Sequence, residues 1–385
     1  MVSKAGSVPV RREGIALFGR RIGPVAALLV LSPFMAEILS GASSPLLPVV
    51  FPPFIFLDLG LYGCGAVLIR EAAVRWGRGW PSILALGVAF ACLEEGLVVS
   101  TFTDPLSPAR QALDASGTWG AGPDGSNWVW IPTLSIFHAV VSIALPILVV
   151  QLAYPSQAAA RWLSGRRALV ALAWLGAAAA VGRAMFSTGA FADGYYARIS
   201  GWQVVVTTGA IAGLVLAARY LPARIGPASG LGRIPAPRLL AFIAGSAYCV
   251  YFLAGFGGKG LGVSPALSLG LVLTVAVVAA PVLMWFSSRD GWSDRHRFAV
   301  PAGVAWFYVG LSVLLGPVNL IVAVLTGYGL WRGWRWLRIG QGTAAAPALE
   351  EPEPESALAE IARRHAATPN LEDEPRRRRL PFGWP

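Results

Sequence analysis

Charged side chains are scarce in this chain. Only 13% of its 385 residues are Asp, Glu, Lys or Arg, and 55% are apolar or aromatic, whereas a typical soluble domain has roughly 25% charged residues. The mean hydropathy of +0.60 points the same way. The apolar residues form long blocks of about 20, the length that a helix needs to cross the hydrocarbon core of a bilayer. The sequence therefore predicts an integral membrane protein with the lipid bilayer as its environment.

Cysteine, histidine and lysine are also rare. The three cysteines, Cys64, Cys92 and Cys249, lie inside apolar blocks without CxxC or Cys/His spacing, which argues against a disulfide framework or a zinc knuckle. Lysine occurs twice and arginine 29 times. This bias, with abundant Ala and Gly, indicates a GC-rich bacterial genome and hence a bacterial cytoplasmic (inner) membrane. The arginines lie in short loops between apolar blocks, so nucleic acid is not expected as a partner.

Nine apolar blocks follow one another along the chain. They are residues 22–39, 46–69, 81–102, 129–153, 168–187, 202–218, 239–256, 265–286 and 301–331. The last block would span about 46 Å as a helix, against roughly 30 Å of hydrocarbon. Gly316-Pro317 lies in its middle, where proline removes a helical hydrogen bond. This block could therefore be one long helix or a hairpin of two.

Arginine placement chooses between these alternatives. With the N-terminus in the cytoplasm, the inner loops hold 18 basic residues and the outer loops only three, Arg110, Arg198 and Lys259, as the positive-inside rule requires. The segment after Trp331 begins with three more arginines, so it should also be cytoplasmic. An even number of crossings follows, and we expect an all-α, polytopic transmembrane helical bundle of about ten helices, with nine as the alternative.

Three regions follow from this topology. Residues 1–21 form a basic cytoplasmic N-terminus, residues 22–338 the transmembrane helical domain, and residues 339–385 a cytoplasmic tail rich in Ala, Pro and Glu. We expect the tail to be disordered, because it cannot bury enough apolar surface to fold alone. Arg376–Arg379 at its end are expected to contact anionic lipid headgroups. The alternative is a solvated tail with no partner.

Ionisable residues inside the apolar blocks are the candidates for function, because they are costly in a bilayer. Most lie in the first four apolar blocks, and the later blocks contribute mainly one arginine. They are Glu37, Asp58, Glu94, Glu95, His138 and Arg183. The first four helices are therefore where a functional site is expected.

Depth in the membrane brings the glutamate pair and the histidine together. If the third helix ends near Phe102 and the fourth begins near Val129, Glu95 lies about 11 Å and His138 about 13 Å below the same outer boundary. Two antiparallel helices joined by one loop are usually neighbours. Ser135 and Ser142 share the face of the fourth helix that carries His138. We therefore predict a site of Glu94, Glu95 and His138.

Supporting residues are predicted around this site. Glu37 and Arg183 approach the same outer boundary of the predicted helices, and Ser142 shares the helix face of His138. A buried carboxylate beside a histidine suits general acid–base work, metal ligation or a proton relay. The same residues could instead form a hydrogen-bonded network that only fixes helix packing. The long loop at 103–128 joins the two helices that carry the pair and the histidine, and such loops often act as functional lids.

The stretch from residue 62 to 155 resembles an uncharacterised family of multi-pass bacterial membrane proteins. The residues that carry the resemblance are Leu68-Ile69-Arg70-Glu71, Gly79-Trp80-Pro81, Leu93-Glu94-Glu95-Gly96, Asn127-Trp128, and His138 with Ser142 to Pro146. The resemblance implies a membrane protein and no particular activity.

A more remote similarity is to the CPBP (CAAX-type) intramembrane proteases, which carry an EExxxR motif on one helix and FxxxH on a following helix. Glu94-Glu95 match the paired glutamates and His138 the histidine. Val99 stands where the motif has arginine, and Leu134 where it has phenylalanine. The similarity implies an intramembrane hydrolase in which Glu94 or Glu95 activates a water and His138 binds a metal or orients it.

Three classes of function therefore stay open on the sequence. The first is a CPBP-like intramembrane hydrolase. The second is an ion- or proton-coupled transporter that uses the same residues as a relay. The third is a structural or assembly protein with no catalysis, in which the polar residues only pack. The sequence identifies no cofactor and leaves any metal unknown.

Overall fold

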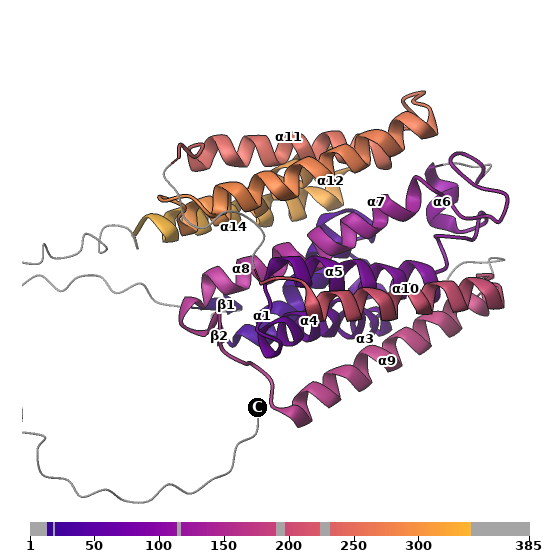
Figure 1. Cartoon of the computed structure of the whole chain (residues 1–385), viewed down its shortest axis with the longest axis horizontal. Helices are drawn as coiled ribbons and strands as arrows, with labels where there is room; N and C mark the ends of the chain where they lie inside the picture. Colours follow the sequence, from indigo (N-terminus) through magenta and orange to yellow (C-terminus); the bar gives the residue numbers. More distant parts are fainter. Residues whose placement is uncertain (1–13, 18–19, 114–116, 190–196, 224–231, 340–385) are drawn as a thin grey trace, which may run out of the picture. The chain divides into compact units, whose positions relative to one another are not determined.

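The structure is a computed structural model that describes residues 14–17, 20–113, 117–189, 197–223 and 232–339 (Figure 1). Nearly all of these belong to one compact unit, Arg12–Leu337. Almost every element in it is a helix, which confirms the predicted all-α class. The predictions for the first residues of the chain, for the disordered tail and for lipid contact by Arg376–Arg379 fall outside the described residues and stay predictions.

A small β-hairpin precedes the first helix, which the sequence did not predict. Strands β1 (Ile15–Leu17) and β2 (Arg20–Ile22) pair antiparallel, with Ile15 opposite Ile22. The phenol of Tyr154 accepts a hydrogen bond from the Ile15 backbone N–H (3.1 Å) and donates one to the Ile22 carbonyl oxygen. The hairpin is therefore fastened to the end of α8 (Leu145–Ala153).

Four helical rods form the first half of the bundle, and each contains a π-helical stretch. The first is α1 (Pro24–Pro33) with η1 (Phe34–Leu39). The second is α3 (Pro53–Asp58), η2 (Leu59–Gly63) and α4 (Cys64–Arg75). The third is α5 (Trp80–Ala91) with η3 (Cys92–Val98), and the fourth is α7 (Trp130–Phe137), η4 (His138–Ala144) and α8. Short helices α2 (Leu47–Val50), α6 (Pro108–Leu113) and η5 (Pro155–Gln157, 3₁₀) lie in the connections.

Six uninterrupted helices follow. They are α9 (Gly165–Ser187), α10 (Gly201–Tyr220), α11 (Pro237–Gly255), α12 (Pro265–Ser287), α13 (Asp294–Leu314) and α14 (Pro317–Ile339). Ser164, Ser200 and Ser264 cap α9, α10 and α12 by accepting a backbone N–H of the first turn, the usual role of serine there. Eight helices of the described chain are long and apolar enough to cross a membrane, and 24–39 adds a shorter apolar one.

The hairpin predicted at Gly316-Pro317 is confirmed. Helix α13 ends at Leu314 and α14 begins at Pro317, with Gly316 at φ +108° between them, a conformation that glycine adopts without strain. The Phe298 and Trp334 rings, at opposite sequence ends of the two helices, lie 5.5 Å apart, so the helices run antiparallel. With α14 and the 24–39 rod, and apart from the short helices in the connections, the described chain has ten helical segments, of which eight are long and apolar enough to cross a membrane; ten crossings stay a prediction.

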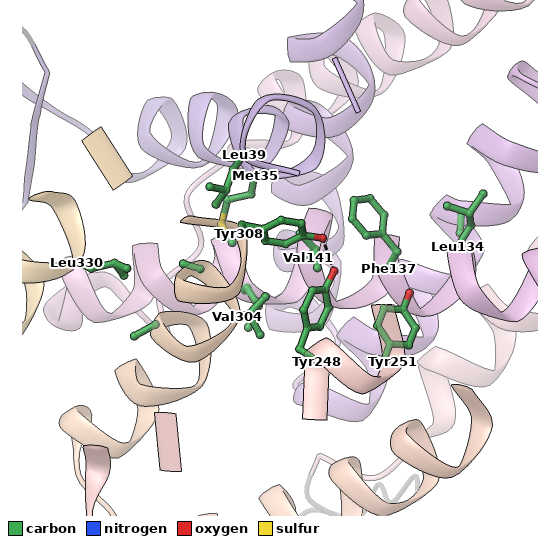
Figure 2. Packing of buried hydrophobic residues seen from close by; sticks show 14 of the residues in the cluster. Met35, Leu39, Leu134, Phe137, Val141, Tyr248, Tyr251, Val304, Tyr308 and Leu330 are labelled. Carbon is green, nitrogen blue, oxygen red and sulfur yellow. Dashed lines mark hydrogen bonds between the residues drawn. The ribbon is translucent and has the colours of Figure 1, made fainter. Parts of the chain in front are cut away.

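The second and fourth rods form the centre of the bundle. In their most apolar windows 72% and 78% of the residues are buried, against 6% for α10 and 11% for α12. One apolar core lies between α1, α4, α5 and α8. The other joins α7, η4, α11 and α13, where Phe137, Tyr248, Tyr251 and Tyr308 pack together (Figure 2). The peripheral helices expose apolar side chains, as lipid-facing helices do.

A polar clasp closes the C-terminal end of α4. Arg75 Nε lies 2.9 Å from Glu71 Oε1, an i,i+4 ion pair on the same helix. The other Glu71 oxygen accepts the Trp162 backbone N–H at 3.0 Å. The fully buried Arg70 donates to the Ala158 carbonyl (2.7 Å), and its guanidinium stacks 3.7 Å from the centre of the Trp162 ring. These contacts fasten the loop between α8 and α9.

Helices α11 and α13 approach each other closely through glycine, as membrane helices commonly do. A Cβ at Gly303 would lie 2.1 Å from the Ala241 carbonyl oxygen, whereas a Cβ at Gly310 on the same helix would meet nothing within 4 Å. We predict that Gly303→Ala destabilises the protein by about 1–3 kcal/mol through overpacking. Gly310→Ala should leave stability unchanged or raise it, since alanine is the better helix former. Thermal unfolding midpoints in detergent test this; equal midpoints for the two variants would contradict the close contact.

Candidate functional site

The polar side chains of the first four rods converge on one cluster, and each comes from a π-helical stretch. Glu37 lies in η1, Tyr62 in η2, the glutamate pair in η3 and His138 in η4. Within the described residues, the π-helical stretches are these four. A π-bulge inserts one residue into a helical turn and is frequently found at functional sites. The local backbone of all four rods is thus altered where the cluster lies.

His138 and Glu95 meet as the sequence predicted. His138 Nε2 lies 3.0 Å from Glu95 Oε1, and its Nδ1 lies 3.1 Å from Ser142 Oγ one turn along η4. The imidazole is 2% exposed. It is wedged between aromatic rings, edge-on to Phe137 at 5.0 Å and stacked on Tyr62 at 6.1 Å. Polar contacts at both ring nitrogens and aromatic contacts around the ring therefore fix the orientation of the His138 imidazole.

Tyr62 links two carboxylates. Its hydroxyl lies within hydrogen-bond distance of Glu37 Oε1 and of Glu94 Oε1. A phenol has one proton to donate, so it satisfies only one of these oxygens at a time. The other contact needs a proton on one of the carboxyl groups, or a cation close by. The Glu37–Tyr62–Glu94 chain therefore holds either a shared proton or a positive charge.

The two adjacent glutamates have different surroundings. Both Glu95 oxygens are satisfied: Oε1 faces His138, and Oε2 accepts the Thr101 hydroxyl. Glu94 Oε2 is buried and makes no hydrogen bond, although it lies only 3.3 Å from His138 Nδ1. At that distance the carboxylate and the imidazole could form an ion pair. However, His138 Nδ1 is already within hydrogen-bond distance of Ser142 Oγ. Buried polar atoms are normally hydrogen-bonded, so Glu94 Oε2 is the exception that the chemistry of the site must explain.

One donor atom from each of Glu94, Glu95 and His138 lies within 4.8 Å of the others, a group that could hold a metal ion. Carboxylate and imidazole together are ligands for Zn²⁺, Fe²⁺ or Mn²⁺. Among the described residues, this is the cluster of His, Cys, Asp and Glu with that property. The three residues predicted from the sequence are thus the ones that the fold brings together.

The cluster connects to the loop at 103–128. The Trp130 indole N–H donates to Thr101 Oγ1 (3.1 Å), and Thr101 donates to Glu95. Trp130 also lines a small pocket formed by side chains of the loop and the end of α11. Its lining residues are Arg110, Trp119, Asn127, Trp130, Gly255, Phe256 and Lys259. Glu95 is therefore the member of the cluster nearest to this pocket.

Polar contacts hold the part of the loop that leads into α7. Asn127 Oδ1 accepts the backbone N–H groups of Val129 (3.0 Å) and Trp130 (2.9 Å), and caps α7. Hydrogen bonds from the Ser126 hydroxyl (2.8 Å) and backbone N–H (3.1 Å) hold the pKa of Asp124 below its ordinary value. A cap that fixes the start of α7 also fixes the direction in which His138 enters the bundle.

Glu37 and Asp58 form the outer edge of the cluster. Glu37 Oε2 accepts the Ser43 hydroxyl at 2.5 Å. Asp58 at the end of α3 interacts electrostatically with Glu37 and Glu94. The carboxylates that interact with Asp58 lie on other helices, so residue spacing within its own helix does not indicate them. Both carboxylates are only partly buried.

Arg183 lies away from the glutamates. It donates to Ser100 Oγ (2.6 Å) and to the Ala197 carbonyl (3.0 Å). Ser100 has φ +63°, and the third rod ends just before it, at Val98 instead of the expected Phe102. Arg183 thus supports the sharp turn that returns Thr101 to Glu95. Its role is to position that turn.

Sequence reasoning missed the neutral members of the cluster, Tyr62, Thr101 and Trp130. An ionisable residue stands out in an apolar block because its charge is costly in a bilayer. Hydroxyl and indole groups are common in such blocks and do not stand out in this way. Ser135, which shares the His138 face, is buried, but no contact joins it to the cluster. Ser142, which was predicted, makes the expected contact.

Comparison with protein families gives one match. The model of an uncharacterized membrane protein family matches residues 26–327. The chain belongs to this family. The match runs from α1 into α14 and includes every residue of the cluster. Comparison with curated proteins and with solved structures found no significant match.

Tyr62→Phe tests whether the phenol holds the cluster together. The change removes one proton donor from between two buried carboxylates, and an unsatisfied buried acceptor costs about 1–3 kcal/mol. We predict a lower thermal unfolding midpoint in detergent. Tyr328→Phe is the matched control, since Tyr328 is 57% exposed on α14, and it should leave the midpoint unchanged. Equal midpoints for both variants would show that the Tyr62 hydroxyl contributes nothing.

Proposed function

We propose that this polytopic membrane protein is a metal-dependent hydrolase whose metal lies between Glu94 and His138. The observation that carries the proposal is the buried Glu94 Oε2, which has no hydrogen bond and lies 3.3 Å from His138 Nδ1. Ligand bonds to Zn²⁺ are about 2.0–2.2 Å long. Two ligands of a tetrahedral ion are then about 3.4 Å apart. The spacing of these two atoms fits one edge of such a site.

Ser142 and Glu95 complete the surroundings of the metal. Ser142 Oγ lies 3.1 Å from His138 Nδ1, and an ion bound at this nitrogen would replace that hydrogen bond. Glu95 faces the other ring nitrogen at 3.0 Å. A histidine that binds metal through one nitrogen normally donates its other N–H to a carboxylate, which fixes the ring and raises its basicity. We therefore assign Glu94 and His138 as ligands and Glu95 as the residue that orients His138.

The chemistry that such a site supplies is activation of water. A bound divalent ion makes a coordinated water nucleophilic at neutral pH. Glu95 holds His138 at the ring nitrogen opposite the metal, so the proton that the water loses would pass to the Glu37–Tyr62 pair beside Glu94. Water would then add to an acyl carbon of the substrate, and the leaving group would depart with that proton.

A transmembrane proton relay is less well supported. The polar contacts lead from His138 to Ser43 through Glu37 and to Trp130 through Thr101. Both ends lie on the side where η1 and η3 end. Between Tyr62 and the clasp at Arg70, the second rod presents only apolar side chains, including the buried Ala66 and Val67. Within the described chain the path is therefore one-sided, as suits a catalytic site.

A purely structural network is also less well supported. Such a network gains from satisfying every buried polar atom, and a partly satisfied one is worse than an apolar core. Glutamine at position 94 could donate as well as accept at this place. Glutamate leaves Oε2 without a hydrogen bond. This arrangement suits an oxygen that binds a cation.

The location follows from the arginine distribution. We place the protein in a bacterial cytoplasmic membrane with both termini in the cytoplasm and the cluster in the outer half. The hydrolase assignment also agrees with the similarity of Glu94, Glu95 and His138 to the CPBP motifs. The substrate would then be reached from the outer half of the bilayer or from its outer surface. Contact between Arg376–Arg379 and anionic headgroups belongs to the same proposal.

Metal content after purification in detergent without chelator tests the proposal. We expect about one Zn²⁺, Fe²⁺ or Mn²⁺ per chain by elemental mass spectrometry. Glu94→Gln and His138→Ala should abolish binding, since each removes a ligand. Glu95→Gln should weaken affinity by about 10–100-fold without abolishing binding, as changes to orienting partners of metal ligands do.

His296→Ala is the matched histidine control. His296 contacts Ser293 at the start of α13, so this variant should keep its metal. Each variant must show an unfolding midpoint measured on metal-free protein, so that loss of binding is separated from loss of fold. The proposal would be wrong if the native protein were purified without metal and also bound no metal ion when titrated with Zn²⁺, Fe²⁺ or Mn²⁺. If Glu94→Gln and Glu95→Gln lost metal binding to the same extent, the assignment of Glu94 as ligand and Glu95 as orienting residue would be wrong.

A further inference from the structure

The connection between the first two rods contains no charged residue. From residue 38 to residue 57 the chain is uncharged, and it includes the run Leu46-Leu47-Pro48-Val49-Val50-Phe51. The loop at 103–128 lies on the same side of the bundle, because rods one and three run in the same direction. That loop carries four charged residues. The uncharged connection is thus suited to an apolar environment, and the charged loop at 103–128 to water.

Helix α2 in this connection has no apolar cover. None of its residues is buried, and Leu46, Val49 and Val50 are 51%, 76% and 73% exposed. Burying such side chains contributes about 1.5–3 kcal/mol each relative to leaving them in water. A four-residue helix is also too short to persist in water by itself. An aqueous setting would therefore be unfavourable for this segment.

The exposed apolar surface continues onto the membrane-facing side of the bundle. Ile55 and Phe56, which follow in α3, are 45% and 42% exposed and belong to the span Pro53–Arg75. Phe56 also contacts Trp174 of α9 at 5.9 Å between ring centres. The surface of α2 is therefore continuous with one that faces lipid. Acyl chains, and not water, match its chemistry.

The same segment covers the outer edge of the cluster. It begins directly after Glu37 and ends directly before Asp58, and these two carboxylates interact electrostatically. Ser43 within it donates to Glu37 at 2.5 Å, and Glu37 is joined through Tyr62 to Glu94. A move of this connection would therefore act on the cluster directly.

We propose that the Leu46–Phe51 segment inserts into the lipid leaflet beside the cluster, so that the Glu37–Asp58 edge opens to the hydrocarbon and not to the aqueous loop. Insertion of a short apolar segment at the interface needs no metal and no catalysis. The inference therefore stands or falls apart from the hydrolase proposal. If both hold, substrate reaches the cluster from within the membrane.

Single-cysteine labelling in nanodiscs tests the insertion. In a full-length background with Cys64, Cys92 and Cys249 replaced by alanine, a fluorophore is attached at Val49→Cys. We expect quenching by brominated lipid as strong as at Val277→Cys, which is 69% exposed on α12. Pro123→Cys in the exposed part of the 103–128 loop should instead be quenched by aqueous iodide. Iodide quenching at position 49 equal to that at 123 would overturn the proposal.

Carbodiimide labelling tests the opening toward lipid. A membrane-soluble carbodiimide should modify Glu37 or Asp58, located by mass spectrometry, whereas a water-soluble one should not. Glu37→Gln and Asp58→Asn each remove one labelling site and identify the reactive group. Asp124 in the exposed loop is the internal control for aqueous access. Labelling of Glu37 or Asp58 by the water-soluble reagent, or by neither reagent, would overturn this part of the inference.

Discussion

The contact between His138 and the two glutamates is the constraint on which the first half of the bundle depends. These groups are buried among apolar helices, where unpaired polar atoms are costly. Apolar side chains alone allow helices to slide and rotate, because lipid is as apolar as they are. Directional bonds from Glu37, Tyr62 and Ser142 allow only one register for the four rods. The aromatic rings of Tyr62, Phe90 and Phe137 then pack around His138 between the rods.

The helices of this fold were predictable because their signals are averaged over many residues. Apolar blocks predict their positions, and the arginine distribution favours an even number of crossings. The length of the last block and the Gly316-Pro317 pair in its middle then favour a hairpin there. Helix ends were less predictable, because a few local contacts determine them. The third rod ends at Val98 since Arg183 and the positive φ of Ser100 support a turn there, and neither feature has a periodic signal.

The cluster was predictable only in part, for a related reason. Counting residues from the helix ends placed Glu95 and His138 at similar depth, and the structure brings them to 3.0 Å. Depth in the membrane does not determine the rotation of a helix about its axis. Arg183, at a similar depth, contacts Ser100 and the Ala197 carbonyl. The π-helical stretches change rotation further, since each inserts a residue that a regular period cannot reveal. Tyr62 enters the cluster from such a stretch, and Thr101 from the turn that follows η3.

The most informative feature is the difference between two neighbouring glutamates. Glu95 accepts bonds at both oxygens, while Glu94 keeps one buried oxygen without a hydrogen bond. Sequence alone treats the pair as equivalent. Packing of four helices around His138 makes them different, with Glu95 holding the ring and Glu94 facing its other nitrogen. A fold that needed only rigidity would gain by satisfying that oxygen. Keeping it unsatisfied beside an imidazole, behind an uncharged segment with an exposed apolar surface, matches what the proposed cation site and a membrane-borne substrate would require.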